Sequence, residues 1–272
     1  MVKKLVKYDF KSFFRLLFPV QMIILGIALI NRLIQLFEVR DSSAYSWIFT
    51  SSIVLLVIAC IVCMVMTVIL SVVRFYQGLY SSEGYLSHTL PVTPSQHIFA
   101  KLSVSLIFAA GTVLTIFVAI CIATFGEVNI ELFKAAGYLL GKGFDKIGFQ
   151  MILYMLEILV YAVLWISNVL MIFYFCLSVG QLAPRKKILL AFGVLFGLYT
   201  ITQIIGTAGI IIAVIAPEWF QNLYDVIAEF AEAHRYLFSH LILSGGALLQ
   251  LLEAAVFFLI SKTIMKKKLN LT

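Results

Sequence analysis

The chain has 272 residues, of which 62% are hydrophobic and only 12% are charged, and its mean hydropathy is +1.07. A soluble domain carries about 25% charged residues, so this composition excludes a water-soluble globular domain. The net charge of +7 reflects lysines and arginines gathered on particular loops and does not indicate nucleic-acid binding.

Long apolar runs are the main organising feature of the chain. A helix needs about 20 apolar residues to cross the hydrocarbon core of a bilayer, and these runs lack the alternation of an outer-membrane barrel strand. The sequence therefore predicts an all-α polytopic membrane protein, a single transmembrane domain over residues 1–272. Its six expected spans are residues 19–36, 47–73, 98–125, 149–182, 188–216 and 241–260.

The first element, residues 1–17, has the pattern of a basic amphipathic helix. Its apolar stripe is formed by Val6, Phe10, Phe13 and Leu17, and its basic stripe by Lys3, Lys7, Lys11 and Arg15. Such a helix lies in the headgroup region of a membrane and is attracted to anionic lipid. Pro19 then lets the chain turn into the bilayer. The alternative is a straight cytoplasmic extension of the first span.

The loop between the second and third spans carries ordered turn and cap signals. Thr93, Pro94 and Gln96 form a capping box with proline at the first helical position, so the third span should begin as an ordered helix. Upstream, residues 82–89 predict a short helix that Pro91 ends, with Glu83 at its N-terminus. The apolar contact points of this short segment are Tyr85, Leu86 and Leu90.

Lysine and arginine are enriched on the side of the membrane that holds both chain termini. This bias predicts cytoplasmic termini under the positive-inside rule. It also places residues 217–239, between the fifth and sixth spans, outside the cell. The basic residues on the terminal side are Lys3, Lys4, Lys7, Lys11, Arg15, Arg74, Lys101, Arg185, Lys186, Lys187, Lys262, Lys266, Lys267 and Lys268.

The stretch RFYQGLYSSEGYLSHTLPVTPSQHIFAKL, residues 74–102, together with LVKYDFKSFFRLLFPV, residues 5–20, resembles the permease subunits of bacterial type-2 ABC exporters. Members share an "EGYL…TLPV" segment and a following lysine, here Lys101. The resemblance implies six spans, an N-terminal interfacial helix, and an extracellular element between spans five and six. It also implies that a coupling helix docks a separate ABC ATPase subunit. The docking residues would be Glu83, Gly84, Tyr85, Leu86 and Leu90.

ATP chemistry by this chain itself is not expected. Residues 137–143, GYLLGKG, resemble a phosphate loop superficially, but their spacing is one residue short. Gly143 also stands where serine or threonine must reach magnesium. ATP and magnesium are therefore assigned to the partner subunit, and no cofactor to this chain. The other expected partners are a second permease subunit and membrane lipids, with no nucleic acid.

Two acidic residues, Glu157 and Glu253, lie inside apolar runs. A carboxylate in hydrocarbon must be protonated, paired or turned toward a polar cavity, so both are candidate functional residues. The alternative is structural: Glu253 accepts hydrogen bonds from Gln250, Asn168 or Gln203 and fixes helix packing.

Cys60 and Cys63 have a C-x-x-C spacing that places two sulfurs on one helix face, but zinc needs four ligands and polar surroundings. The four cysteines are therefore interpreted as small buried apolar residues, and the four histidines show no spacing typical of a ligand set or a catalytic triad.

The sequence thus predicts a permease subunit of an ATP-driven exporter in the bacterial plasma membrane, with no chemistry of its own. Two other functions remain open. One is a proton-coupled secondary transporter that uses Glu157 and Glu253 as proton carriers. The other is a non-transporting membrane protein, such as an immunity or sensor subunit. The substrate is left open among amphipathic peptides, lipids and hydrophobic drugs.

Overall fold

A computed structural model describes residues 2–36, 43–81, 84, 92–125 and 127–267. These residues form eight helices and no strand. The expectation of an all-α protein is therefore confirmed over the described ranges. The helices are α1 (Val2–Leu36), α2 (Ser43–Tyr80), α4 (Pro94–Ala123), α5 (Glu127–Ile147), α6 (Gln150–Gly180), α7 (Lys187–Ile215), α8 (Pro217–Ala233) and α9 (Arg235–Lys267).

Six of these helices are long and apolar enough to cross a membrane, namely α1, α2, α4, α6, α7 and α9. The prediction of a polytopic protein with six apolar helices is thus confirmed. The observed helices extend beyond several of the expected spans. α9 begins at Arg235, inside the range assigned to the extracellular element, because a helix can continue past the apolar run that signals it.

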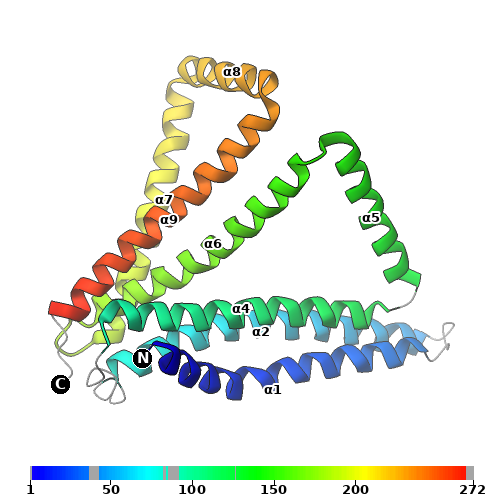
Figure 1. The fold of residues 1–272 in the computed structure, drawn as a ribbon, viewed down its shortest axis with the longest axis horizontal. Helices are drawn as coiled ribbons and strands as arrows, with labels where there is room; N and C mark the ends of the chain where they lie inside the picture. The colour runs from blue at the N-terminus through cyan, green and yellow to red at the C-terminus, as the bar shows by residue number, and fades with distance from the viewer. Residues whose placement is uncertain (1, 37–42, 82–83, 85–91, 126, 268–272) are drawn as a thin grey trace. The chain divides into compact units, whose positions relative to one another are not determined.

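The chain divides into two compact units, Met1–Lys146 and Ile147–Thr272. In the first unit, α1, α2 and α4 pack side by side as a three-helix bundle (Figure 1). One buried cluster joins Phe13 and Leu17 of α1 to Val104 and Phe108 of α4. A second cluster lies further along the bundle and contains Ile24, Ala28, Leu56, Cys63, Ala119 and Ala123.

Hydroxyl and amide groups also join the three helices of the first unit. Thr67 of α2 and Thr112 of α4 share a hydrogen bond of 2.9 Å between their hydroxyl oxygens. Gln21 of α1 donates from Nε2 to the same Thr112 oxygen at 3.4 Å. Interhelical hydrogen bonds of this kind stabilise packing in a bilayer, where burial of apolar area gives no net driving force.

α1 runs without interruption through Pro19, which differs from the expected turn at that residue. Proline removes one backbone hydrogen bond from a helix interior. Packing holds the helix on both sides of it, because Leu17 and Ile24 are fully buried against the neighbouring helices. Membrane helices tolerate proline where neighbouring elements support the backbone in this way.

In the second unit, α6 packs against both α9 and α7, and α8 connects α7 to α9 (Figure 1). The α6–α9 contact includes a ring pair between Phe175 and Phe257, whose centroids are 4.8 Å apart. It also includes Gly246, where a β-carbon would approach Tyr161 Cε2 to 3.1 Å. Small residues at such positions let two membrane helices approach closely.

The helix α5 is a feature that the apolar runs did not indicate. Its charged residues lie on one face of the helix when residues are placed at 3.6 per turn. The helix ends at Gly148, whose φ of 53° is a left-handed conformation that glycine adopts without steric cost. The charged residues on that face are Glu127, Glu131, Lys134, Lys142, Asp145 and Lys146.

Candidate functional site

The loop before α4 is described at its two ends. Gly84 donates its backbone N–H to the Ser81 carbonyl at 2.8 Å and lies against the end of α2. A β-carbon on Gly84 would come within 2.5 Å of the Leu79 carbonyl oxygen, so only glycine fits there without backbone movement. The other predicted docking residues, Glu83, Tyr85, Leu86 and Leu90, lie outside the described residues.

The start of α4 has the predicted capping box. The backbone N–H of Thr93 donates to Gln96 Oε1 at 3.0 Å, and the reciprocal contact of the Thr93 side chain with the backbone of Gln96 is also present. Pro94 occupies the first helical position, where its missing N–H costs nothing. The cap therefore fixes the point at which the loop ends and the third apolar helix begins.

Lys101 ties the start of α4 to the other two helices of its bundle. Its Nζ lies 3.3 Å from Asp9 Oδ1 on α1, and the two side chains are 9% and 21% exposed. The same nitrogen donates to the Arg74 carbonyl on α2 at 3.3 Å. A β-carbon on Gly78 would collide with this ammonium group. Lys101, which belongs to the segment of residues 74–102, is thus held between three helices.

The N-terminal segment is helical, and the four residues of its basic stripe, Lys3, Lys7, Lys11 and Arg15, are exposed. Two members of its apolar stripe are buried in the bundle: the Phe13 and Phe108 rings stack with centroids 5.3 Å apart, and Leu17 is fully buried. Phe10, in the same stripe, is 40% exposed. Placement in the headgroup region remains a prediction.

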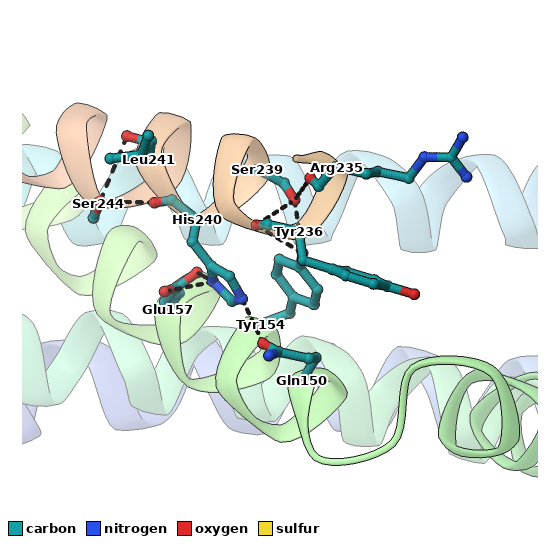
Figure 2. A network of polar contacts seen from close by, with 9 residues as sticks. All are labelled: Gln150, Tyr154, Glu157, Arg235, Tyr236, Ser239, His240, Leu241 and Ser244. Atoms are coloured by element: carbon teal, nitrogen blue, oxygen red, sulfur yellow. Dashed lines mark hydrogen bonds and ion pairs between the residues drawn. The ribbon is translucent and has the colours of Figure 1, made fainter. Parts of the chain in front are cut away.

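Glu157 forms the centre of a polar cluster between α6 and α9. Nδ1 of His240 lies 2.8 Å from both carboxylate oxygens of Glu157. Nε2 of the same ring lies 2.7 Å from Gln150 Oε1. Figure 2 shows the imidazole between these two α6 side chains, which are seven residues apart and point to the same side of the helix.

Tyr154 completes this cluster from the same face of α6. Its ring stacks on the His240 ring, with centroids 4.3 Å apart and an interplanar angle of 8°. Its hydroxyl oxygen lies 2.6 Å from the Ser239 hydroxyl oxygen (Figure 2). Stacking and hydrogen bonds therefore fix the histidine ring in position, with 19% of its side chain exposed and 27% of that of Glu157.

Glu253 has a simpler environment than Glu157. Asn168 of α6 donates from Nδ2 to Glu253 Oε2 at 2.8 Å, which is one of the three partners that the sequence suggested. Gln250 Oε1 is buried and has no hydrogen-bond partner within the described part of the chain. Gln203 lies on the exposed surface of α7. Within the described ranges, no hydrogen bond joins it to Glu253.

Sequence reasoning missed His240 as the partner of Glu157. The two residues are 83 positions apart, and His240 fell at the edge of the range expected to be extracellular. One usable signal was present: Gln150 and Glu157 are spaced at i and i+7, which places them on one helix face. Two polar side chains on one face of an apolar helix indicate a polar partner on a neighbouring helix.

Metal-ligating residues do not gather in the described ranges, where no group of three or more histidine, cysteine, aspartate or glutamate side chains lies together. Cys60, Cys63, Cys121 and Cys176 are free thiols. Residues 137–143, which resemble a phosphate loop, lie within the helix α5. A phosphate loop instead needs backbone N–H groups that are not engaged in a helix.

No protein-family model matches the chain, and no curated protein or solved structure matches it. The segment of residues 74–102 and the polar contacts between helices are therefore the features of this chain that bear on its function.

Proposed function

We propose that this chain is the permease subunit of an ATP-binding-cassette exporter in a bacterial plasma membrane, with both termini in the cytoplasm. The observation that carries the proposal is that both ends of the loop before α4 are fixed to the helices beside them. Gly84 fits against the Leu79 carbonyl, and the Thr93–Gln96 cap orders the start of α4. A loop anchored in this way can pass force into the bundle.

The proposed mechanism places ATP binding and hydrolysis in a separate subunit. That ATPase docks on residues 82–90 and changes its own conformation when it binds ATP. Because Lys101 is bonded to Asp9 and to the Arg74 carbonyl, displacement at the start of α4 is transmitted to α1 and α2. The coupling energy is the difference in ATPase affinity for the two permease conformations.

The remaining parts of the proposal concern partners. A second permease subunit, identical or related, completes the transport path. The exposed basic stripe of Lys3, Lys7, Lys11 and Arg15 supports contact with anionic headgroups, at about 1 kcal/mol for each basic residue near the surface.

Co-purification of the chain with a phosphate-loop ATPase subunit tests the proposal. Tyr85→Ala with Leu86→Ala removes apolar contact area, at about 25 cal/mol per Å², and should reduce the amount of ATPase recovered. Substrate-stimulated ATP hydrolysis in liposomes should fall in parallel. Glu83→Lys places a positive charge at the N-terminus of the short helix predicted over residues 82–89, opposing its dipole by about 0.3–1 kcal/mol, and should reduce stimulation more than recovery.

A matched control is available on α5, where Leu139 and Leu140 are 67% and 42% exposed. Leu139→Ala with Leu140→Ala also removes apolar side chains, on the opposite side of the membrane in the proposed topology, and should leave ATPase recovery unchanged. Equal recovery and stimulation for the Tyr85/Leu86 variant and its parent would exclude the loop as the coupling element. Absence of any ATPase from gently extracted parent protein would overturn the exporter proposal.

One observation favours the second candidate function, a proton-coupled secondary transporter. Glu157 faces a histidine rather than a neutral amide, and a carboxylate–histidine pair within a membrane helix contact is typical of proton relays. Uptake or efflux driven by an imposed pH gradient in liposomes without ATP would support this function and count against the exporter.

A further inference from the structure

Both ring nitrogens of His240 make short polar contacts with side chains of α6. Nδ1 faces the two oxygens of Glu157 at 2.8 Å, and Nε2 faces Gln150 Oε1 at 2.7 Å. Both nitrogens therefore face acceptor oxygens. A neutral imidazole has one N–H donor and one lone pair, so with an ionised Glu157 it would leave one of these short contacts without a hydrogen.

Two arrangements of protons satisfy both contacts. In one, the imidazolium donates from Nδ1 to an ionised Glu157 and from Nε2 to Gln150. In the other, a protonated Glu157 donates to Nδ1 while Nε2–H donates to Gln150. Each arrangement holds one proton more than a neutral imidazole beside a carboxylate.

Gln150 also allows the cluster to lose that extra proton. A half-turn of its amide replaces the acceptor oxygen with an NH₂ donor in nearly the same volume. The NH₂ group then donates to the lone pair that Nε2 gains on deprotonation, and Nδ1–H continues to donate to Glu157. Both protonation states therefore keep their hydrogen bonds, and the exchangeable proton belongs to Nε2.

Among the charged side chains on the helices that pack around His240, Glu157 is the one that contacts its ring. On α6, Glu157 is the one acidic or basic residue between Gln150 and Gly180, and Tyr154 stacks on the ring. On α9, Arg235 extends away from the cluster in Figure 2, and Glu253 bonds with Asn168. α8 also packs on α9, and its acids, Glu218, Asp225, Glu229 and Glu232, are exposed.

We propose that Glu157 and His240 form a proton-binding site at the α6–α9 contact, and that Gln150 responds to its occupancy by turning its amide. On binding, the Nε2 lone pair takes a proton from hydronium and releases water. The charged pair then adds an electrostatic attraction between the two helices. This inference does not rest on the exporter proposal, because it concerns contacts within one unit and no ATPase.

Nuclear magnetic resonance of the ring nitrogens tests the site directly. The full chain is labelled with ¹⁵N-histidine, purified in detergent micelles and studied from about pH 5 to about pH 8, where histidine changes charge. The variant His240→Gln identifies the His240 signals among those of the four histidines. We expect both nitrogens to carry protons at low pH, and Nε2 alone to lose its proton as the pH rises.

Substitution of the counter-ion supplies the decisive comparison. Glu157→Gln removes the carboxylate that pairs with the imidazolium, so the fraction of doubly protonated His240 ring at a given pH should fall. Glu157→Asp keeps the charge and should lower that fraction by less, and it replaces the glutamine variant if that variant fails to fold. The control is Glu253→Gln, which changes the other acidic residue of the apolar runs, bonded to Asn168, and should leave the His240 signals unchanged.

Two results would overturn the proposal. One is a His240 ring that keeps a single proton over the whole pH range. The other is proton loss at the same pH in the parent and in both Glu157 variants. ATPase recovery plays no part in this readout, so failure of the exporter proposal and failure of the proton site are distinguishable.

Discussion

Lys101 on α4 places its ammonium nitrogen 3.3 Å from Asp9 Oδ1 on α1 and donates to the Arg74 carbonyl on α2. One side chain thus connects all three helices of the first bundle at the end where the predicted docking loop joins them. Both side chains are largely shielded, so each charge depends on the other for stabilisation.

Removing one partner of this pair should destabilise the first bundle. Lys101→Met leaves Asp9 buried without its counter-charge, and we expect a loss of about 1.5–3 kcal/mol in unfolding free energy, as for hydrogen bonds to charged groups. Asp9→Leu combined with Lys101→Met removes both charges and should be less destabilised than Lys101→Met alone. Denaturant unfolding in detergent measures both values. The single variant Asp9→Leu completes the comparison. If the double variant loses as much unfolding free energy as the two single variants together, the pair contributes no coupling energy.

Gly84 should not tolerate a side chain. The β-carbon of Gly84→Ala would lie 2.5 Å from the Leu79 carbonyl oxygen and 2.7 Å from its carbon, so the backbone must move at the start of the docking loop. We expect reduced ATPase recovery with the six apolar helices still folded. The matched control is Gly141→Ala, where a β-carbon meets no atom within 4 Å; there alanine should stabilise α5 by about 0.5–1 kcal/mol. Full ATPase recovery by Gly84→Ala would refute the expectation.

The contact between Asn168 and Glu253 should depend on the amide donor more than on the charge of the acceptor. Glu253→Gln keeps an oxygen that accepts from Asn168 Nδ2 and should change stability little. Asn168→Leu removes the donor to the exposed carboxyl group of Glu253 and should cost about 0.5–1.5 kcal/mol, the typical contribution of one hydrogen bond. Thermal unfolding of the two variants gives the comparison. The reverse order of stability would show that the negative charge itself matters at this position.

The basic stripe at the N-terminus should influence membrane orientation. Reversing Lys3, Lys7, Lys11 and Arg15 to glutamate removes cytoplasmic positive charge and attraction to anionic lipid. We expect weaker insertion or altered orientation in a topology-reporter assay. The control reverses Lys134, Lys142 and Lys146 on α5, which lie on the opposite side in the charge-based topology, and should leave orientation unchanged. Normal topology in the four-residue variant would refute the role of the stripe.

Local sequence was sufficient to predict the elements that depend on neighbouring residues. The apolar runs indicated the six long helices, because backbone groups in hydrocarbon must pair within their own segment. Thr93 and Gln96 indicated the cap of α4 because both partners of that contact lie within one turn. α5 was missed because its amphipathic pattern has no long apolar run.

The tertiary structure decided which distant side chains meet. Lys101 and Asp9 are 92 positions apart, and His240 and Glu157 are 83 apart, and no local pattern specifies either pairing. These contacts depend on which helices pack together and on their rotation about their own axes, and both are settled by side-chain packing along the whole helix contact. The sequence by itself therefore determined that Glu157 needs a polar partner, because an isolated carboxylate is costly in a membrane. Only helix packing decided that the partner is His240, whose ring can carry a proton.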